Sequence, residues 1–278
     1  MDVLEELVRL RRSGERCALA TIVEVDGSVP SFESAKMLVR QDGSIVGTVG
    51  GGCVEGEVRT VARAVMETGK PRLLSFNLSH DAAYQEGLIC GGQLEIFVEP
   101  IEPQLRAFLF GAGHISQSLA QVTRLLGFHT TVIDNRQSFA NRERFPEAEE
   151  IVAAAFEEVF PQLTINSSSY LIIVTRGHRD DMLVLRWAVT TAARYIALIG
   201  SKRKVISVVA ELEKEGVPRE RLERIYGPMG LAIGALTPEE IAISVGAEMV
   251  AVHRQPKSNW QALSMSFFRH DESKAPLP

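Results

Sequence analysis

The sequence predicts an α/β protein in which a doubly wound parallel sheet forms the C-terminal part and a smaller mixed α+β domain forms the N-terminal part. Three observations lead to this fold class. After residue 104, strongly apolar runs alternate with helical patterns, as in a parallel sheet covered by helices on both faces. Before that point the strand-like runs are short and separated by glycines. The length of 278 residues is sufficient for two domains.

The N-terminal domain is expected over residues 1–103. Its one clear helix is indicated by Val54, Val58 and Val65, which recur at helical spacing. Short runs rich in aliphatic residues predict the strands of this domain, at 18–25, 36–40, 44–49, 72–77 and 93–98. Glycines punctuate these runs, which favours a small mixed α+β domain.

The C-terminal domain is expected over residues 104–256, after a polar, proline-containing joint. Runs rich in Leu, Ile and Val predict its strands, at 106–110, 130–133, 170–174 and 195–199. The final helix has Thr237 as N-cap, Pro238 at its first position and an acidic residue placed to close a capping box. No periodicity continues beyond it, so residues 257–278 are predicted to be a flexible tail.

Composition excludes several function classes. The 30 basic and 35 acidic residues form no long basic block, which argues against a nucleic-acid-binding protein. No apolar run approaches the roughly 20 residues that cross a bilayer, and the start of the chain lacks the pattern of a secretory signal. Three widely spaced cysteines predict neither a disulfide framework nor a metal site. A cytoplasmic protein is expected, and a homodimer is the commonest assembly for this class.

A glycine-rich turn follows the predicted strand 106–110. Gly111 and Gly113 lie between that strand and an amphipathic helix, and Asp134 ends the next strand. In a Rossmann-like unit such a turn admits a phosphate at the helix N-terminus, and such an acid binds a ribose. Arg136 lies where a 2′-phosphate would be bound. A tight turn that binds no ligand remains the alternative.

Polar residues follow two further strands of the same predicted sheet. Arg176 and His178 come after the strand 170–174, and Ser201 comes after the strand 195–199. Doubly wound sheets bind their ligands at this edge. Each of these residues is therefore a candidate for binding a phosphate or an acidic partner, although His178 and Asp180 could instead only cap the helix that follows.

A second glycine-rich turn lies in the N-terminal domain, where Gly50, Gly51 and Gly52 precede Cys53 and a helix. Consecutive glycines allow positive φ angles and exposed N–H groups that hold an anion. A thiol at a helix N-terminus gains thiolate character. Cys90 lies in another glycine-rich turn, which suggests a pocket shared by the two cysteines. A packing turn with a buried cysteine is the alternative.

Several segments together resemble the XdhC/CoxI family of xanthine dehydrogenase accessory proteins. They cover nearly the whole chain in the family's order and read GSVP, TVGGGCVEGEV, CGGQLEIFVEP, FGAGHISQSLA, TVIDNR, VTRGHRDD, YIALIGSKRK and GPMGLAIGALTPEEIAISVGAE. The resemblance implies a chaperone that binds molybdenum cofactor (molybdopterin), supports its sulfuration and delivers it to a molybdenum hydroxylase of the xanthine dehydrogenase type, with a cysteine desulfurase as a further candidate partner.

By this resemblance the first cofactor-binding candidates are Gly50, Gly51, Gly52, Cys53 and Glu55, followed by Cys90. The Rossmann-like part adds Gly111, Gly113, His114, Asp134, Arg136, Arg176, His178 and Ser201. No metal-ligating residues and no catalytic residues are predicted, so the sequence does not decide whether the protein is an enzyme. The residue types alone also admit an NAD(P)-dependent oxidoreductase, or a scaffold without ligand that docks onto a dehydrogenase.

The chain departs from the family pattern at two places. Relatives commonly read GSxPRxxGAxML, whereas this chain has Ser31 in place of the arginine and Ser34 in place of the glycine. They read GLDIGA where this chain has Ala232 in place of the acid. Any ligand or partner contact made by those three family residues would be altered here.

Overall fold

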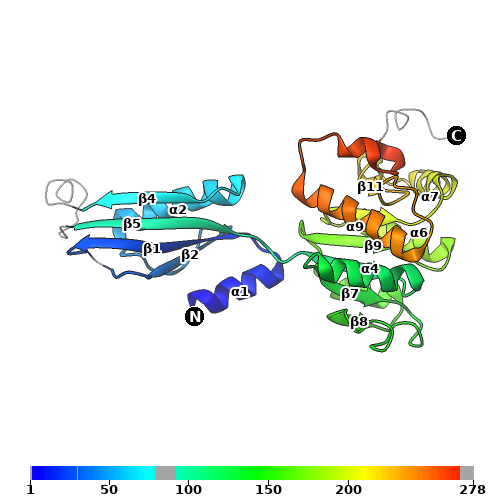
Figure 1. Ribbon diagram of the computed structural model, residues 1–278, viewed down its shortest axis with the longest axis horizontal. Helices are drawn as coiled ribbons and strands as arrows, with labels where there is room; N and C mark the ends of the chain where they lie inside the picture. The colour runs from blue at the N-terminus through cyan, green and yellow to red at the C-terminus, as the bar shows by residue number, and fades with distance from the viewer. Residues whose placement is uncertain (1, 30, 79–91, 270–278) are drawn as a thin grey trace. The chain divides into compact units, whose positions relative to one another are not determined.

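The structure is a computed structural model that describes residues 2–29, 31–78 and 92–269 (Figure 1). The chain divides into two compact units, Met1–Gln104 and Leu105–Pro278, here called unit 1 and unit 2. Unit 1 contains an antiparallel sheet and unit 2 a parallel sheet. The predicted fold class is therefore confirmed.

Unit 1 is built on a five-stranded sheet with the order β3-β2-β1-β5-β4. Its elements are α1 (Val3–Ser13), β1 (Cys17–Gly27), β2 (Lys36–Arg40), β3 (Ile45–Gly47), α2 (Gly52–Thr68), β4 (Arg72–Asn77) and β5 (Gly92–Ile101). Because successive side chains of a strand point to opposite faces, Ala18 and Ile22 pack in the core with Val58 of α2, while Leu19 packs with Leu10 of α1. The two helices thus cover opposite faces of the sheet.

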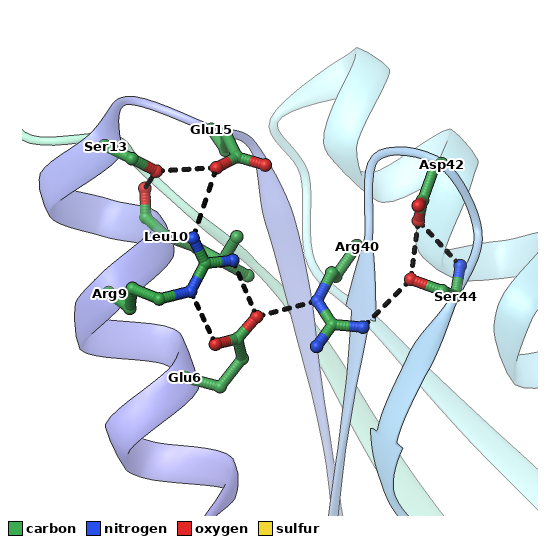
Figure 2. A network of polar contacts seen from close by, with 8 residues as sticks. All are labelled: Glu6, Arg9, Leu10, Ser13, Glu15, Arg40, Asp42 and Ser44. Carbon is green, nitrogen blue, oxygen red and sulfur yellow. Dashed lines mark hydrogen bonds and ion pairs between the residues drawn. The ribbon is translucent and has the colours of Figure 1, made fainter. Parts of the chain in front are cut away.

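A buried carboxylate connects α1 to the sheet of unit 1. Figure 2 shows Arg9 and Arg40 directed at Glu6, whose side chain is only 1% exposed. Glu6 Oε1 accepts a hydrogen bond from Arg40 Nε at 2.7 Å, and Glu6 Oε2 accepts one from Arg9 Nε at 2.7 Å. These hydrogen bonds lower the pKa of Glu6 to about 2, and the one from Arg9 has the larger effect. The ion pair fixes α1 at the end of β2.

Unit 2 is a three-layer α/β domain with the parallel strand order β11-β10-β9-β6-β7-β8. Its strands are β6 (Arg106–Phe110), β7 (His129–Ile133), β8 (Glu150–Val152), β9 (Ser169–Ile173), β10 (Tyr195–Leu198) and β11 (Ile225–Tyr226). Its helices are α4 (His114–Leu125), α5 (Phe156–Val159), η1 (Phe160–Gln162), α6 (His178–Ala188), α7 (Lys202–Lys214), α8 (Arg219–Leu222), α9 (Pro238–Arg254), η2 (Trp260–Leu263) and η3 (Phe267–Arg269). Numbered along the chain, this is the Rossmann order, with its switch point between β6 and β9.

Two cores separate the layers of unit 2. Leu119 of α4 and Met249 of α9 pack on one face of the sheet, and Leu185 of α6 and Val205 of α7 pack on the other. In Figure 1, α4 and α9 lie on the same side of the sheet. A Cβ added at Gly246 of α9 would lie 2.5 Å from Val122 Cγ1 of α4, so glycine is required for these helices to approach each other closely.

The C-terminal segment differs from the flexible tail that the sequence predicts over 257–278. Two short 3₁₀ helices, Trp260–Leu263 and Phe267–Arg269, lie in this segment, and Trp260, Phe267 and Phe268 are no more than 9% exposed. The buried Glu248 of α9 accepts hydrogen bonds from Tyr195 Oη and Ser264 Oγ, both at 2.5 Å. Burial of three aromatic side chains and the hydrogen bond from Ser264 to Glu248 order a segment that has no periodicity. Residues 270–278 lie outside the described part of the chain.

Local differences from the sequence prediction occur where strands are short. The strand expected over 44–49 is limited to Ile45–Gly47, and β8 and β11, of three and two residues, were not predicted. Runs of this length give no recognisable period.

Ser34, where the family pattern has glycine, has a φ of +68°, a left-handed conformation in which glycine carries no steric cost.

Candidate functional site

The glycine-rich turn of unit 1 connects β3 to α2. Gly50, Gly51 and Gly52 have φ angles of +120°, +80° and +60°, as the sequence predicts for three consecutive glycines. Gly51 is the N-cap residue of α2, and no side chain caps this helix. A Cβ added at Gly51 would have nothing within 4 Å. The helix N-terminus is therefore open to a ligand beside Gly51.

Glu55 folds back from the first turn of α2 and occupies part of this turn. Its Oε1 accepts hydrogen bonds from Thr48 Oγ1 at 2.6 Å, from Gly51 N at 3.1 Å and from Val49 N at 3.3 Å. Thr48 Oγ1 also accepts a hydrogen bond from Gly50 N at 3.2 Å. Several N–H groups that could bind an anion are therefore bonded to side chains of the chain itself, a role of Thr48 that the sequence analysis missed.

The cysteines differ in accessibility. Cys53, in the first turn of α2, is exposed, and Cys17 of β1 is buried. Burial, followed by the charges of Glu6 and Glu15, raises the pKa of Cys17 to about 11. Cys90 lies outside the described residues, so the predicted pocket shared with Cys53 stays a prediction. Of the two described thiols, Cys53 is the one that a ligand at the turn could reach.

The glycine-rich turn of unit 2 connects β6 to α4. Gly111 has a φ of +107°, and a Cβ there would lie 2.4 Å from the Val174 carbonyl oxygen, so the turn and the end of β9 are in contact at the switch point. Gly113 is the N-cap of α4 without a side-chain cap, and a Cβ there would meet nothing within 4 Å. Ser116, which replaces the third glycine, donates its hydroxyl to the Gly111 carbonyl at 2.5 Å. His114 begins α4 and is exposed.

Asp134 and Arg136 form a bidentate ion pair beside this turn. Asp134 Oδ1 accepts hydrogen bonds from the Nε and the backbone N of Arg136, both at 2.9 Å. Asp134 Oδ2 accepts hydrogen bonds from Arg136 Nη2 at 2.7 Å and from Ala112 N at 2.8 Å. Burial raises the pKa of Asp134, but the hydrogen bonds from Arg136 and Ala112 outweigh it, so the pKa lies below its ordinary value. The structure thus brings the end of β7, with Asp134 and Arg136, next to the turn after β6, where Ala112 lies.

A cavity of about 490 Å³ lies at the same edge of the sheet, and its lining includes Asn135, Arg176, His178 and Arg179. Two of the candidates, Arg176 and His178, therefore lie together. His178 does not cap α6, whose N-cap is Gly177 without a side-chain cap, and its Nε2 lies 3.2 Å from Glu211 Oε2. Ser201 has a different position, because its Oγ caps α7 by accepting a hydrogen bond from Lys204 N at 3.3 Å.

The longer helices fall into two classes by their N-termini. Among the described helices of eight or more residues, α1, α7 and α9 are capped by the side chains of Asp2, Ser201 and Thr237. The other three, α2, α4 and α6, begin at a glycine without a side-chain cap. Each of these three helices follows a segment predicted to bind a ligand. The remaining predicted segment, which contains Ser201, precedes α7, and Ser201 itself caps that helix.

The described residues contain neither a metal-ligand cluster nor a membrane-spanning helix. In residues 2–29, 31–78 and 92–269, no three or more His, Cys, Asp or Glu side chains come together in a group that could hold a metal ion. Over the same ranges, no helix combines the length and the apolar character needed to span a bilayer.

Three curated proteins show sequence similarity to this chain. It is 36% identical to the uncharacterized protein YqeB of Escherichia coli over 253 residues, which are 91% of this chain but only 46% of YqeB. It is 25% identical to the molybdenum cofactor insertion chaperone PaoD of E. coli, covering 90% of this chain and 87% of PaoD. It is 22% identical to a probable xanthine dehydrogenase subunit of Bacillus subtilis, covering 87% of this chain and 94% of that protein.

A solved structure and two family models extend the comparison. The structure described as a xanthine dehydrogenase from Bacillus halodurans superposes with a TM-score of 0.50 at 23% identity, over 93% of this chain and 97% of that one, which supports the fold. The model of the XdhC Rossmann domain matches residues 108–249. The model of the XdhC and CoxI family matches residues 10–77. The chain therefore belongs to the XdhC/CoxI family.

Proposed function

We propose that this protein is an accessory protein for a molybdenum hydroxylase of the xanthine dehydrogenase type. In this role it binds molybdenum cofactor, supports its sulfuration and delivers it to the enzyme. Family membership and the similarity to a molybdenum cofactor insertion chaperone support the accessory role. The observation that carries the binding step is the open, glycine-capped N-terminus of α2 in unit 1, beside the exposed Cys53.

The residues of this turn fit the phosphate of a pterin cofactor. Three consecutive glycines with positive φ leave no Cβ between the backbone and a ligand, and a Cβ at Gly51 would meet nothing within 4 Å. The start of a helix of 17 residues carries a partial positive charge that favours a phosphate. The Glu55 carboxylate already accepts hydrogen bonds from two amides of the turn. An incoming phosphate would exchange with that carboxylate or bind beside it.

Cys53 supplies the sulfur chemistry of the proposal. Its position in the first turn of α2 places the thiol at the positive end of the helix, where a thiolate is stabilised relative to a solvated thiol. An exposed cysteine side chain beside the bound cofactor can contact a sulfur-reactive molybdenum centre. In the proposed role, this contact protects the terminal sulfur during transfer.

Anaerobic cofactor binding tests the proposal. The full chain is mixed with molybdopterin under anaerobic conditions, passed over a desalting column, and the retained pterin is measured by fluorescence after oxidation. We expect retention near one cofactor per chain, and at least a tenfold loss in Gly51→Val, whose side chain would project into the open space at the helix start. Cys53→Ser is expected to retain less cofactor, or to lose it faster in air.

A matched control is available one turn further along α2. Gly56→Val adds the same side chain at a position where a Cβ would also meet nothing within 4 Å, but away from the turn, so its retention should equal that of the original chain. Retention that is absent in the original chain, or equal in all four proteins, would refute the proposed site. Equal thermal transitions of the four proteins would show that altered retention does not reflect unfolding.

A further inference from the structure

The cavity of unit 2 lies where a Rossmann sheet binds the nucleoside part of its ligand. Its lining includes residues from the loops that follow β7, β8 and β9, among them Asn135, Ala155 and Arg176. These loops lie at the carboxyl edge of the sheet, next to the switch point between β6 and β9. A volume of about 490 Å³ is within the usual range of small-molecule sites.

The cavity carries several hydrogen-bond donors. Arg176 and Arg179 contribute guanidinium groups, His178 contributes an imidazole, and Asn135 contributes an amide. The acidic residues of the lining are Glu157 and Asp180. Guanidinium groups bind phosphates through charge-assisted hydrogen bonds and stack on heteroaromatic rings, so the lining suits an anionic ligand with a ring system.

The residue expected to bind a free ribose has no acceptor capacity left. Each oxygen of Asp134 already accepts two hydrogen bonds, three of the four from Arg136 and one from Ala112. A carboxylate offers about four such positions, and the Asp134 side chain is only 5% exposed. Hydroxyl groups of a ribose could bind here only if the bidentate ion pair were broken.

Arg136, next to Asp134, has free hydrogen-bond donors where Asp134 has no free acceptor. Its guanidinium lies 3.8 Å from the centroid of the Phe139 ring, and its side chain is 25% exposed. A guanidinium has five N–H donors, of which those on Nε and Nη2 reach Asp134. The hydrogen bond to Asp134 raises the pKa of Arg136, and the charge of Asp180, which lines the cavity, raises it further. Asn135, the residue before Arg136, lines the cavity, and Arg136 keeps N–H donors for an anion beside it.

We propose that this cavity binds the nucleoside end of an adenine nucleotide whose ribose carries a phosphate, and that Arg136 selects it over the same nucleotide with an unphosphorylated ribose. The ribose phosphate receives hydrogen bonds from Arg136, which remains paired with Asp134. Arg176 and Arg179 contact the nucleoside part. This inference concerns unit 2 alone and does not depend on cofactor binding at the turn of unit 1.

Two matched pairs of nucleotides test the proposal on the full chain. NADPH is compared with NADH, and coenzyme A with dephospho-coenzyme A, so that a 2′-phosphate and a 3′-phosphate are examined separately. Binding is followed by the emission of the reduced nicotinamide or by calorimetry. We expect at least one phosphorylated nucleotide to bind tenfold or more tightly than its partner. Binding of none up to about 1 mM, or equal binding within both pairs, would overturn the proposal.

Variants separate selection from binding. Arg136→Leu should weaken the phosphorylated nucleotide at least tenfold and leave the unphosphorylated one unchanged or tighter, because Asp134 becomes available to ribose hydroxyls. Arg136→Lys keeps the charge and should retain part of the preference, which covers the case in which Arg136→Leu does not fold. Arg176→Gln should weaken both nucleotides. Arg203→Gln, at an exposed arginine outside the cavity lining, should change neither. An equal loss for both nucleotides in Arg136→Leu would contradict selection by Arg136.

Discussion

The two glycine-rich turns of the molecule each hold a carboxylate of the chain against their backbone N–H groups, but the two carboxylates are held in different ways. In unit 1, Glu55 comes from the helix that follows the turn, is half-buried, and accepts hydrogen bonds from a hydroxyl and two amides. In unit 2, Asp134 comes from the end of the next strand, is buried, and is paired with Arg136.

This difference predicts different responses to a ligand. The partners of Glu55 found in the described residues are neutral, so a phosphate competes with it directly for the same amides. Asp134 is neutralised by an arginine, and breaking a buried pair leaves an uncompensated charge. We therefore expect the turn of unit 1 to rearrange when it binds a ligand, and the turn of unit 2 to keep its shape.

Gly111→Ala is the first of two variants for which we expect the largest effects. The new Cβ would meet the Val174 carbonyl at 2.4 Å, and a φ of +107° is unfavourable for alanine. We expect unit 2 to lose about 3 kcal/mol of unfolding free energy. Both tryptophans, Trp187 and Trp260, lie in unit 2, so urea unfolding followed by tryptophan fluorescence measures this unit.

Gly113→Ala is the matched control for Gly111→Ala, since its φ of −76° suits alanine and its Cβ would meet nothing within 4 Å. It should unfold at the same urea concentration as the original chain. If the two variants were equally stable, the close contact between the turn and β9 would not constrain unit 2.

The two carboxylates are compared directly by Asp134→Asn and Glu55→Gln. Removing the charge of Asp134 leaves Arg136 without its ionic partner and should cost about 3 kcal/mol. Glu55→Gln keeps an acceptor for the amides and should cost less than about 1 kcal/mol. Tryptophan fluorescence measures the first loss and far-ultraviolet circular dichroism the second. Equal losses would contradict the distinction between a fixed and a displaceable carboxylate.

Acid should weaken unit 1 through Glu6. Because the pKa of Glu6 is lowered from 4.5 to about 2 in the folded chain, its stabilisation is fully present above pH 4.5 and is lost as the pH falls through 2. Glu6→Gln should lower the thermal transition of unit 1 by about 5 °C or more at pH 7. The difference in unfolding free energy between the variant and the original chain should close toward pH 2, and hydrogen exchange of the amides of unit 1 measures this difference. A gap that stays constant with pH would contradict a charged Glu6.

A smaller gain is expected from Ser34→Gly. The φ of +68° at Ser34 costs a side chain about 1 kcal/mol relative to glycine. Restoring the family's glycine should therefore raise the unfolding free energy of unit 1 by about that amount in the same circular dichroism measurement. A loss of stability would show instead that the greater chain entropy of glycine in the unfolded state outweighs the strain.

The last prediction leaves stability unchanged and concerns access to the turn of unit 1. In a Cys90→Ser background, a water-soluble thiol reagent should label Cys53 at least 100-fold faster than Cys17, whose thiol is buried and has a pKa of about 11. Mass spectrometry of the labelled peptides measures the two rates. Molybdopterin should slow the labelling of Cys53 alone, and similar rates for both thiols would exclude an accessible turn.

The sequence predicts elements better than it predicts the states of side chains. Long apolar runs such as 106–110 gave the strands of unit 2, and three consecutive glycines indicated the positive φ angles at residues 50–52. The sequence did not indicate that Glu55 returns to its own turn or that Arg136 saturates Asp134. Both contacts depend on rotamers and burial, which residue spacing does not specify. The ordered segment at 260–269 was missed for the same reason, since its order depends on contacts with α7, α9 and β11 rather than on local pattern.

The hydrogen bonds of Glu248 have a practical consequence for dividing the protein. A chain shortened at residue 256 would remove Ser264 and leave a fully buried carboxylate with Tyr195 and Gly230 N as its remaining donors. It would also uncover the apolar surface beneath Trp260 and Phe267. An isolated Rossmann unit intended for binding experiments should therefore extend at least through residue 269.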